Sequence, residues 1–128
     1  MREPTAGEAV WEPLSEDVRR TLEVLLAGES GQDPVYRAQI PHALMKPGCM
    51  CGCPSQDLRV GPRGVSAARA ESGASPIVAS RPLRSPEGAC VGEALLFAAE
   101  GLMVSLEVCH WEALGPLDQP LWQQLGPV

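Results

Sequence analysis

The chain has 128 residues, 13 of them glycine and 13 proline, and a formal net charge of −6. This length suits one domain, and the scarcity of aromatic residues leaves Leu, Val and Ala to fill a small core. The acidic balance argues against nucleic acid or an anionic membrane as partner, since both require a basic surface. No apolar run could span a bilayer, and the first residues lack the apolar part of a secretory signal. We therefore expect a cytoplasmic protein with mostly reduced thiols.

Residues 1–13 are mostly polar and are expected to form a loose lead-in to a single domain over 14–111. A helix is predicted over about 15–27, because Ser15 is a suitable N-cap and apolar residues then recur at helical spacing. These apolar residues are Val18, Leu22, Leu25 and Leu26. A short second helix is predicted over 34–39, where an Asp-Pro step marks the start and Pro41 limits the length.

The middle of the chain predicts short strands separated by loops. His42–Met45 and Gln56–Val60 are expected to pair as a hairpin-like unit, with a cysteine cluster at its tip or in its returning strand. Residues 61–75 lack periodicity and are rich in Gly, Pro, Ala and Ser, which is typical of a flexible loop. Ile77–Ala79 is an expected edge strand between prolines, and 112–128 is a proline-rich tail.

The strongest pattern is a two-stranded hairpin over 94–110 that turns at Glu100-Gly101. A two-residue turn there, with regular alternation, places one apolar row on a single face. The row is Leu95, Phe97, Ala99, Leu102, Val104, Leu106 and Val108. We expect this row to pack against the first helix. The alternative of one continuous helix from Gly92 is disfavoured by the central glycine and by the later Val/Leu alternation.

These elements predict an α+β fold, in which the helices pack on a small, mostly antiparallel sheet of four or five strands with the 94–110 hairpin central. The second face of the hairpin mixes polar and apolar side chains, which favours a partner-binding surface. The residues expected on this face are Met103, Ser105, Glu107, Cys109 and Trp111.

Three cysteines, Cys49, Cys51 and Cys53, stand in a Gly- and Pro-flanked segment. Thiolates bind zinc well, and a fourth ligand could come from Cys90, Cys109, His42 or His110. The spacing is a weak match, because structural zinc sites pair two separated knuckles, and in a regular strand the sulfurs would be about 7 Å apart. Packing of small, soft residues in a tight turn is the alternative.

No catalytic constellation is visible. Cys109 and His110 are neighbours in a predicted strand and would point to opposite faces, so they form no dyad. The sequence carries no phosphate-binding glycine loop, nucleophile elbow or metalloprotease motif. We therefore predict no catalytic and no cofactor-binding residues.

Two segments resemble small uncharacterised bacterial proteins. Leu95-Leu-Phe, Glu100-Gly101-Leu and Leu106-Glu-Val are similar to a C-terminal hairpin found in such proteins, some of them in toxin-immunity-like families. Ile40-Pro-His-Ala and Cys51-Gly-Cys-Pro-Ser resemble a cysteine-bearing segment of one such group. The resemblance covers under half the chain. It implies a bacterial α+β domain without a known activity.

The leading hypothesis is a non-enzymatic protein that binds a protein partner, immunity-like at the finest level. The alternative is a zinc-binding structural or sensing protein that uses the Cys49, Cys51 and Cys53 cluster. A thiol-dependent enzyme is a third hypothesis and would require a depressed thiol pKa.

Overall fold

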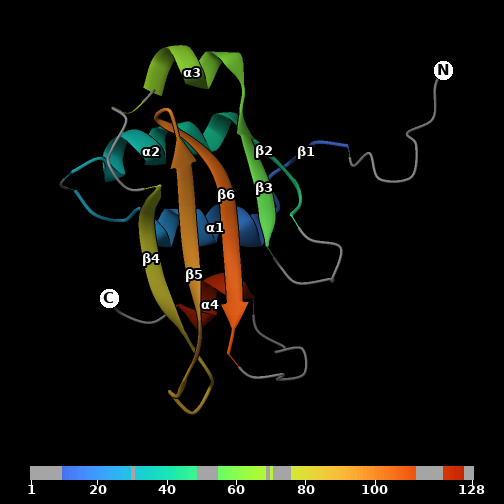
Figure 1. Cartoon of the computed structure of the whole chain (residues 1–128), viewed down its shortest axis with the longest axis vertical. Helices are drawn as coiled ribbons and strands as arrows, with labels where there is room; N and C mark the ends of the chain where they lie inside the picture. The colour runs from blue at the N-terminus through green and yellow to red at the C-terminus, as the bar shows by residue number, and fades with distance from the viewer. Residues whose placement is uncertain are drawn as a thin grey trace.

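The computed structural model describes residues 10–29, 31–48, 55–68, 70, 76–111 and 120–125, and these form an α+β fold (Figure 1). The helices in this part of the chain are α1 (Glu16–Leu25), α2 (Asp33–Gln39), the 3₁₀ turn η1 (Ile40–His42), α3 (Pro62–Ala68) and α4 (Leu121–Gln124). The strands are β1 (Glu12–Pro13), β2 (Ala43–Pro47), β3 (Gln56–Val60), β4 (Ile77–Arg84), β5 (Cys90–Ala99) and β6 (Leu102–His110).

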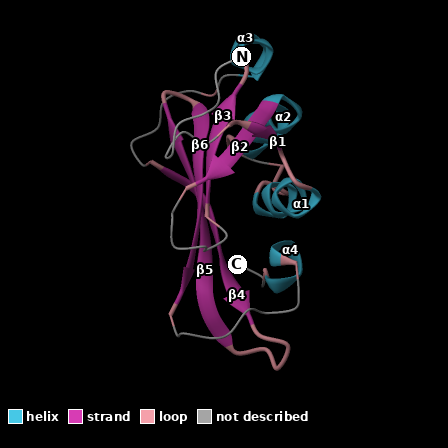
Figure 2. Cartoon of the chain, turned by 90° about the vertical axis from the view of Figure 1, so that its right-hand side faces the viewer, coloured by secondary structure: helices cyan, strands magenta, loops and turns pink. Residues whose placement is uncertain are grey.

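The strands form one antiparallel sheet in the order β1-β2-β3-β6-β5-β4. This is one strand more than the upper end of the predicted four to five, because residues 12–13 of the expected lead-in pair with β2. β5 and β6 both have a strand on each side. α1, α2 and α4 lie on one side of the sheet and α3 lies at its end (Figure 2). No helix among the described residues is long and apolar enough to cross a membrane.

α1 confirms the predicted first helix. The Ser15 hydroxyl accepts a hydrogen bond from the Val18 backbone N–H at 3.2 Å, which satisfies one of the unpaired donors at the helix start. The predicted apolar residues are all buried, and Leu22 and Leu26 are fully so. The backbone carbonyls that follow α1 accept hydrogen bonds from α2. Arg37 donates to the Leu26 oxygen at 2.8 Å and to the Gly28 oxygen at 3.0 Å.

The second helix and the β2–β3 hairpin also form at the predicted places. The described part of the predicted loop 61–75 differs from the prediction, because Pro62–Ala68 forms the helix α3. Gly61 begins this helix by accepting hydrogen bonds from the backbone N–H groups of Gly64 and Val65, and Pro62 suits the first helical position. This helix is short and apolar at only a few positions, so it leaves no clear periodicity in the sequence.

The β5–β6 turn is confirmed, with Ala99 paired to Leu102 and positive φ angles of 54° at Glu100 and 79° at Gly101. The predicted face of the hairpin is wrong over most of its length. Ala98 pairs with Met103 but Phe97 pairs with Ser105, so Val104 is an extra residue that forms a β-bulge. An extra residue reverses the alternation on β6 relative to β5.

The consequence is that Leu106 and Val108 face the helices as predicted, but their cross-strand neighbours are Leu96 and Ala94. The buried side of the hairpin consists of Ala94, Leu96, Ala98, Met103, Leu106 and Val108. The other residues of the predicted apolar row, Leu95, Phe97, Ala99 and Leu102, belong to the opposite side, and Val104 is 38% exposed at the bulge.

Gln39 fixes the hairpin tip to the helical layer. Its side chain is fully buried; its amide Nε2 donates to the Gly101 carbonyl at 2.8 Å, and its Oε1 accepts from the Met103 backbone N–H at 3.1 Å. The Gly101 carbonyl also accepts from the Ala70 N–H at 3.0 Å. Nearby Tyr36 is part of the core, and burial raises the pKa of its hydroxyl.

α4 returns the C-terminal part of the chain to α1. Asp17, in the first turn of α1, accepts hydrogen bonds from the backbone N–H groups of Leu121 at 3.0 Å and Trp122 at 3.1 Å. The Arg20 guanidinium lies over the Trp122 ring at 5.0 Å. Leu121 is buried and Leu125 forms an isolated bridge with Leu83 of β4. Leu121 and Leu125 therefore pack back onto the domain.

Candidate functional site

The side of the sheet opposite α1, α2 and α4 carries no described helix, and we name it the open face (Figures 1 and 2). The strand register arranges its side chains in three rows across the strands. The first row is Ile77, Phe97, Ser105, Asp57 and Lys46; the second is Ser80, Leu95 and Glu107; the third is Pro82, Glu93 and Cys109. Trp111 directly follows the third row at the end of β6.

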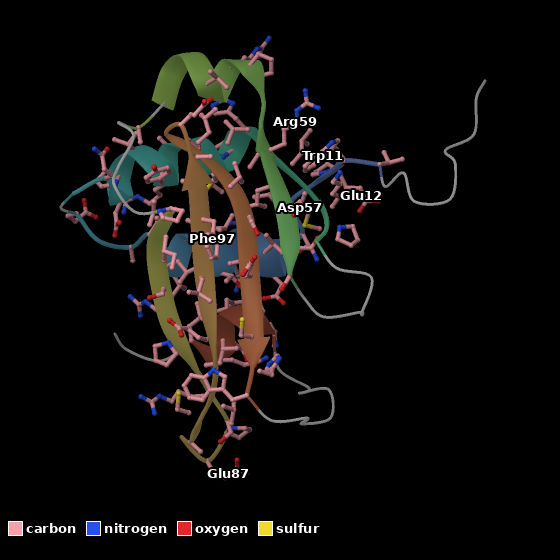
Figure 3. All side chains as sticks on the ribbon, in the orientation of Figure 1. Trp11, Glu12, Asp57, Arg59, Glu87 and Phe97 are labelled. Carbon is pink, nitrogen blue, oxygen red and sulfur yellow. The ribbon has the colours of Figure 1, made fainter. Side chains whose placement is uncertain are left out.

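The centre of the open face is apolar. Leu95 and Phe97 are half-buried, and Ile77 at its β4 edge is 42% exposed. Figure 3 shows Phe97 near the middle of the sheet, with Asp57 and Arg59 on β3 to one side. A half-buried leucine and phenylalanine on a face that no described helix covers form an apolar patch that is partly open to water.

The second and third rows carry two carboxylates, Glu93 and Glu107, and no cation. Within the described part of the chain, neither carboxylate forms an ion pair. The ion pairs of Arg19, Arg20 and Arg37 all belong to the helical layer. These two carboxylates therefore place negative charge beside the apolar centre, on β5 and β6.

A hollow of about 150 Å³ lies beside the third row, lined by Ser80, Arg81, Pro82, Gly92, Glu93 and Trp111. Arg81 and Gly92 are at the alternate positions of their strands, where register pairs Arg81 with buried Ala94 and Gly92 with buried Leu83. Side chains at those positions point toward the helical layer. The walls on the open face therefore come from the other four residues.

Trp111 is 63% exposed, yet its backbone is fixed, because its N–H donates to the Val91 carbonyl at 3.0 Å. The rings of the other two tryptophans each stack with a cationic side chain of the same protein. Arg20 lies over Trp122 at 5.0 Å and Lys46 over Trp11 at 4.7 Å. No described cation lies over the Trp111 ring.

The partner-binding face predicted from sequence is brought together in part. Ser105, Glu107 and Cys109 lie on the open face and Trp111 lies at its end. The prediction that Met103 lies on this face is wrong. Met103 is 1% exposed and faces the helices, because the bulge at Val104 reverses the alternation between Met103 and Ser105.

The open-face residues that sequence reasoning missed include the apolar centre, Leu95 and Phe97, and two residues of the hollow, Glu93 and Pro82. The first two were assigned to the core side by the uninterrupted register. A signal of the bulge was present in the three consecutive apolar residues 102–104, which break strict alternation.

The predicted thiolate ligands Cys49, Cys51 and Cys53 lie outside the described residues. The residues on either side of that segment are Gly48 and Ser55, joined by a hydrogen bond of 3.0 Å. The Ser55 hydroxyl accepts from the Val108 N–H at 2.9 Å, so Ser55 lies close to the end of β6.

Of the proposed fourth ligands, Cys109 and His110 are at that end of β6, whereas His42 precedes β2 and lies at its opposite end. The thiols of Cys90 and Cys109 are free and exposed. The described residues contain no group of three His, Cys, Asp or Glu side chains that could hold a metal ion.

Comparisons of the chain with protein-family models, with curated proteins and with solved structures give no match.

Proposed function

We propose that this chain is a protein-binding domain whose open face takes a protein partner. The observation that carries the proposal is the half-buried apolar centre at Leu95 and Phe97, which no described helix covers and which the carboxylates of Glu93 and Glu107 border. An apolar centre with a polar rim is the arrangement found at protein interfaces. The immunity-like resemblance of the hairpin stays a prediction that agrees with a binding role.

The sheet presents this surface rigidly. β5 and β6 are paired on both sides, and their opposite side chains are locked into the core, where Leu96 and Leu106 are fully buried. A partner would therefore meet side chains on a fixed backbone and would pay little ordering entropy. Burying Leu95 and Phe97 fully would contribute about 25 cal/mol for each Å² of apolar area removed from water.

The test is site-directed photo-cross-linking in the organism that encodes the protein. The photoreactive residue p-benzoylphenylalanine is placed at Ser80, exposed on the open face, and separately at Glu23, exposed on α1. We expect one discrete cross-linked protein from position 80 only, and its loss on Phe97→Asp.

The captured protein is then purified and its binding to the wild-type chain and to Phe97→Asp is measured directly. The unfolding midpoint of the variant establishes that it is folded. Equal cross-linking from positions 80 and 23, or binding that persists in folded Phe97→Asp, contradicts the proposal.

A further inference from the structure

We infer that the hollow at Trp111, Glu93 and Pro82 accepts an arginine side chain of the protein partner. This inference rests on the proposed function and specifies one contact of it. The hollow combines an indole face, a carboxylate and a proline ring, which are the groups that a guanidinium on an aliphatic stem can contact together.

Size restricts the occupant. The volume of about 150 Å³ corresponds to roughly five water molecules. Pockets for metabolites and cofactors are larger, about 300–1,000 Å³. The hollow therefore has room for the end of one long side chain.

Charge selects the kind of side chain. Glu93 is the carboxylate of the hollow, and no described residue forms an ion pair with it. Arg81 belongs to the lining, but its register position directs its side chain to the helical layer. A cation in the hollow would therefore meet the Glu93 carboxylate, which would repel an anion.

The aromatic wall favours arginine over lysine. A guanidinium stacks flat on an indole and can give two parallel hydrogen bonds to one carboxylate, while an ammonium acts as a compact, strongly hydrated charge. The chain already holds Arg20 over Trp122 and Lys46 over Trp11. Trp111 offers the same kind of ring to a cation from outside, on a backbone fixed by the bond to Val91.

The test uses the full chain and a small probe, N-acetyl-L-arginine methylamide, followed by ¹H–¹⁵N NMR. The neutral isostere with citrulline in place of arginine is the matched ligand control. We expect saturable shifts at Gly92, Glu93 and the Trp111 indole N–H with the arginine probe, and weaker or no shifts with citrulline. Binding should weaken about three- to tenfold in Trp111→Ala and in Glu93→Gln.

Glu107→Gln is the matched protein control, because Glu107 lies on the open face outside the hollow, and it should leave probe binding nearly unchanged. All three positions are at least partly solvent-exposed, and unchanged spectra elsewhere establish that each variant folds. Equal shifts with citrulline, or shifts that Glu93→Gln does not reduce, overturn the inference.

The two proposals can fail separately. If the arginine probe fails to bind while the cross-linked partner is still lost on Phe97→Asp, the open face binds a partner and the arginine contact is wrong. If the probe binds at the hollow but the cross-linking from position 80 equals that from position 23, the cation site stands and the proposed function is wrong.

Discussion

At the scale of single residues, the hairpin tip depends on a glycine and a glutamine. Gly101 has a φ of +79°, and a Cβ there would overlap the Ala70 carbonyl oxygen. Gly88 has a similar φ of +88°, but a Cβ there would meet nothing within 4 Å. Gly88→Ala should therefore cost about 1 kcal/mol from backbone strain alone, and Gly101→Ala at least twice that. Urea unfolding of both variants checks this, and equal costs would mean that the Ala70 contact relaxes freely.

Gln39 is the second such residue. Gln39→Leu removes the bonds to Gly101 and Met103 and leaves the buried Met103 N–H without its side-chain acceptor. We expect a loss of about 2–4 kcal/mol in the free energy of unfolding. Gln123, exposed on α4, is the matched control, and Gln123→Leu should change stability by less than about 0.5 kcal/mol. A loss below 1 kcal/mol for Gln39→Leu would show that water or a shifted backbone replaces the two hydrogen bonds of the Gln39 side chain.

At the scale of elements, the bulge at Val104 gives an unusual prediction. With Val104 deleted, the pairs Ala98–Met103 and Phe97–Ser105 become successive, and every other residue keeps its face. The deletion should therefore retain cooperative unfolding and cost less than about 2 kcal/mol, although deletions in central strands normally reverse the faces. Deleting Phe97 is the control, because it moves Leu96 and Ala94 to the open face and should abolish folding. A Val104 deletion that fails to fold contradicts the prediction.

Asp17 joins α1 to α4. Asp17→Ala removes the acceptor for the Leu121 and Trp122 N–H groups and should release α4 with a cost of about 0.5–2 kcal/mol. Hydrogen exchange should accelerate at 121–125 while the central strands keep their protection. Glu23→Ala removes the exposed pair with Arg19 in the same helix and should leave 121–125 protected. Exchange that accelerates equally in all elements would indicate global destabilisation instead.

The elements with strong local signals were predictable, whereas β1, α3, α4 and the relation of the strands across the sheet were not. The Ser15 cap and apolar spacing predicted α1, and the Asp33-Pro34 step predicted α2, although the N-cap of α2 is Gln32. Two short strand patterns predicted the β2–β3 hairpin and the glycine at 101 predicted the main turn, because these signals are local. The face of the hairpin depends on which residue the opposite strand skips, a property of two strands together. The hollow depends in addition on the register of β4 against β5 and on the bond that fixes Trp111. Alternation along the second strand was enough to predict Trp111, whereas predicting Pro82 and Glu93 requires the register of β4 against β5.

At the scale of the whole molecule, the proposed interface implies that the two faces of the sheet serve folding and binding separately, and two adjacent leucines can test this. Leu96 is fully buried against the helical layer, and Leu95 is half-buried on the open face. Leu96→Ala should lower the free energy of unfolding by about 2–5 kcal/mol, and Leu95→Ala by less than about 1 kcal/mol.

The effects on the partner should be reversed. Leu95→Ala should weaken binding of the cross-linked partner, while Leu96→Ala, measured at a temperature where it stays folded, should bind as the wild type does. Chemical denaturation gives the first comparison and titration with the captured partner the second. If one of these leucines controlled both the free energy of unfolding and partner binding, the open face would be part of the core. That result would remove the physical basis of the proposed interface.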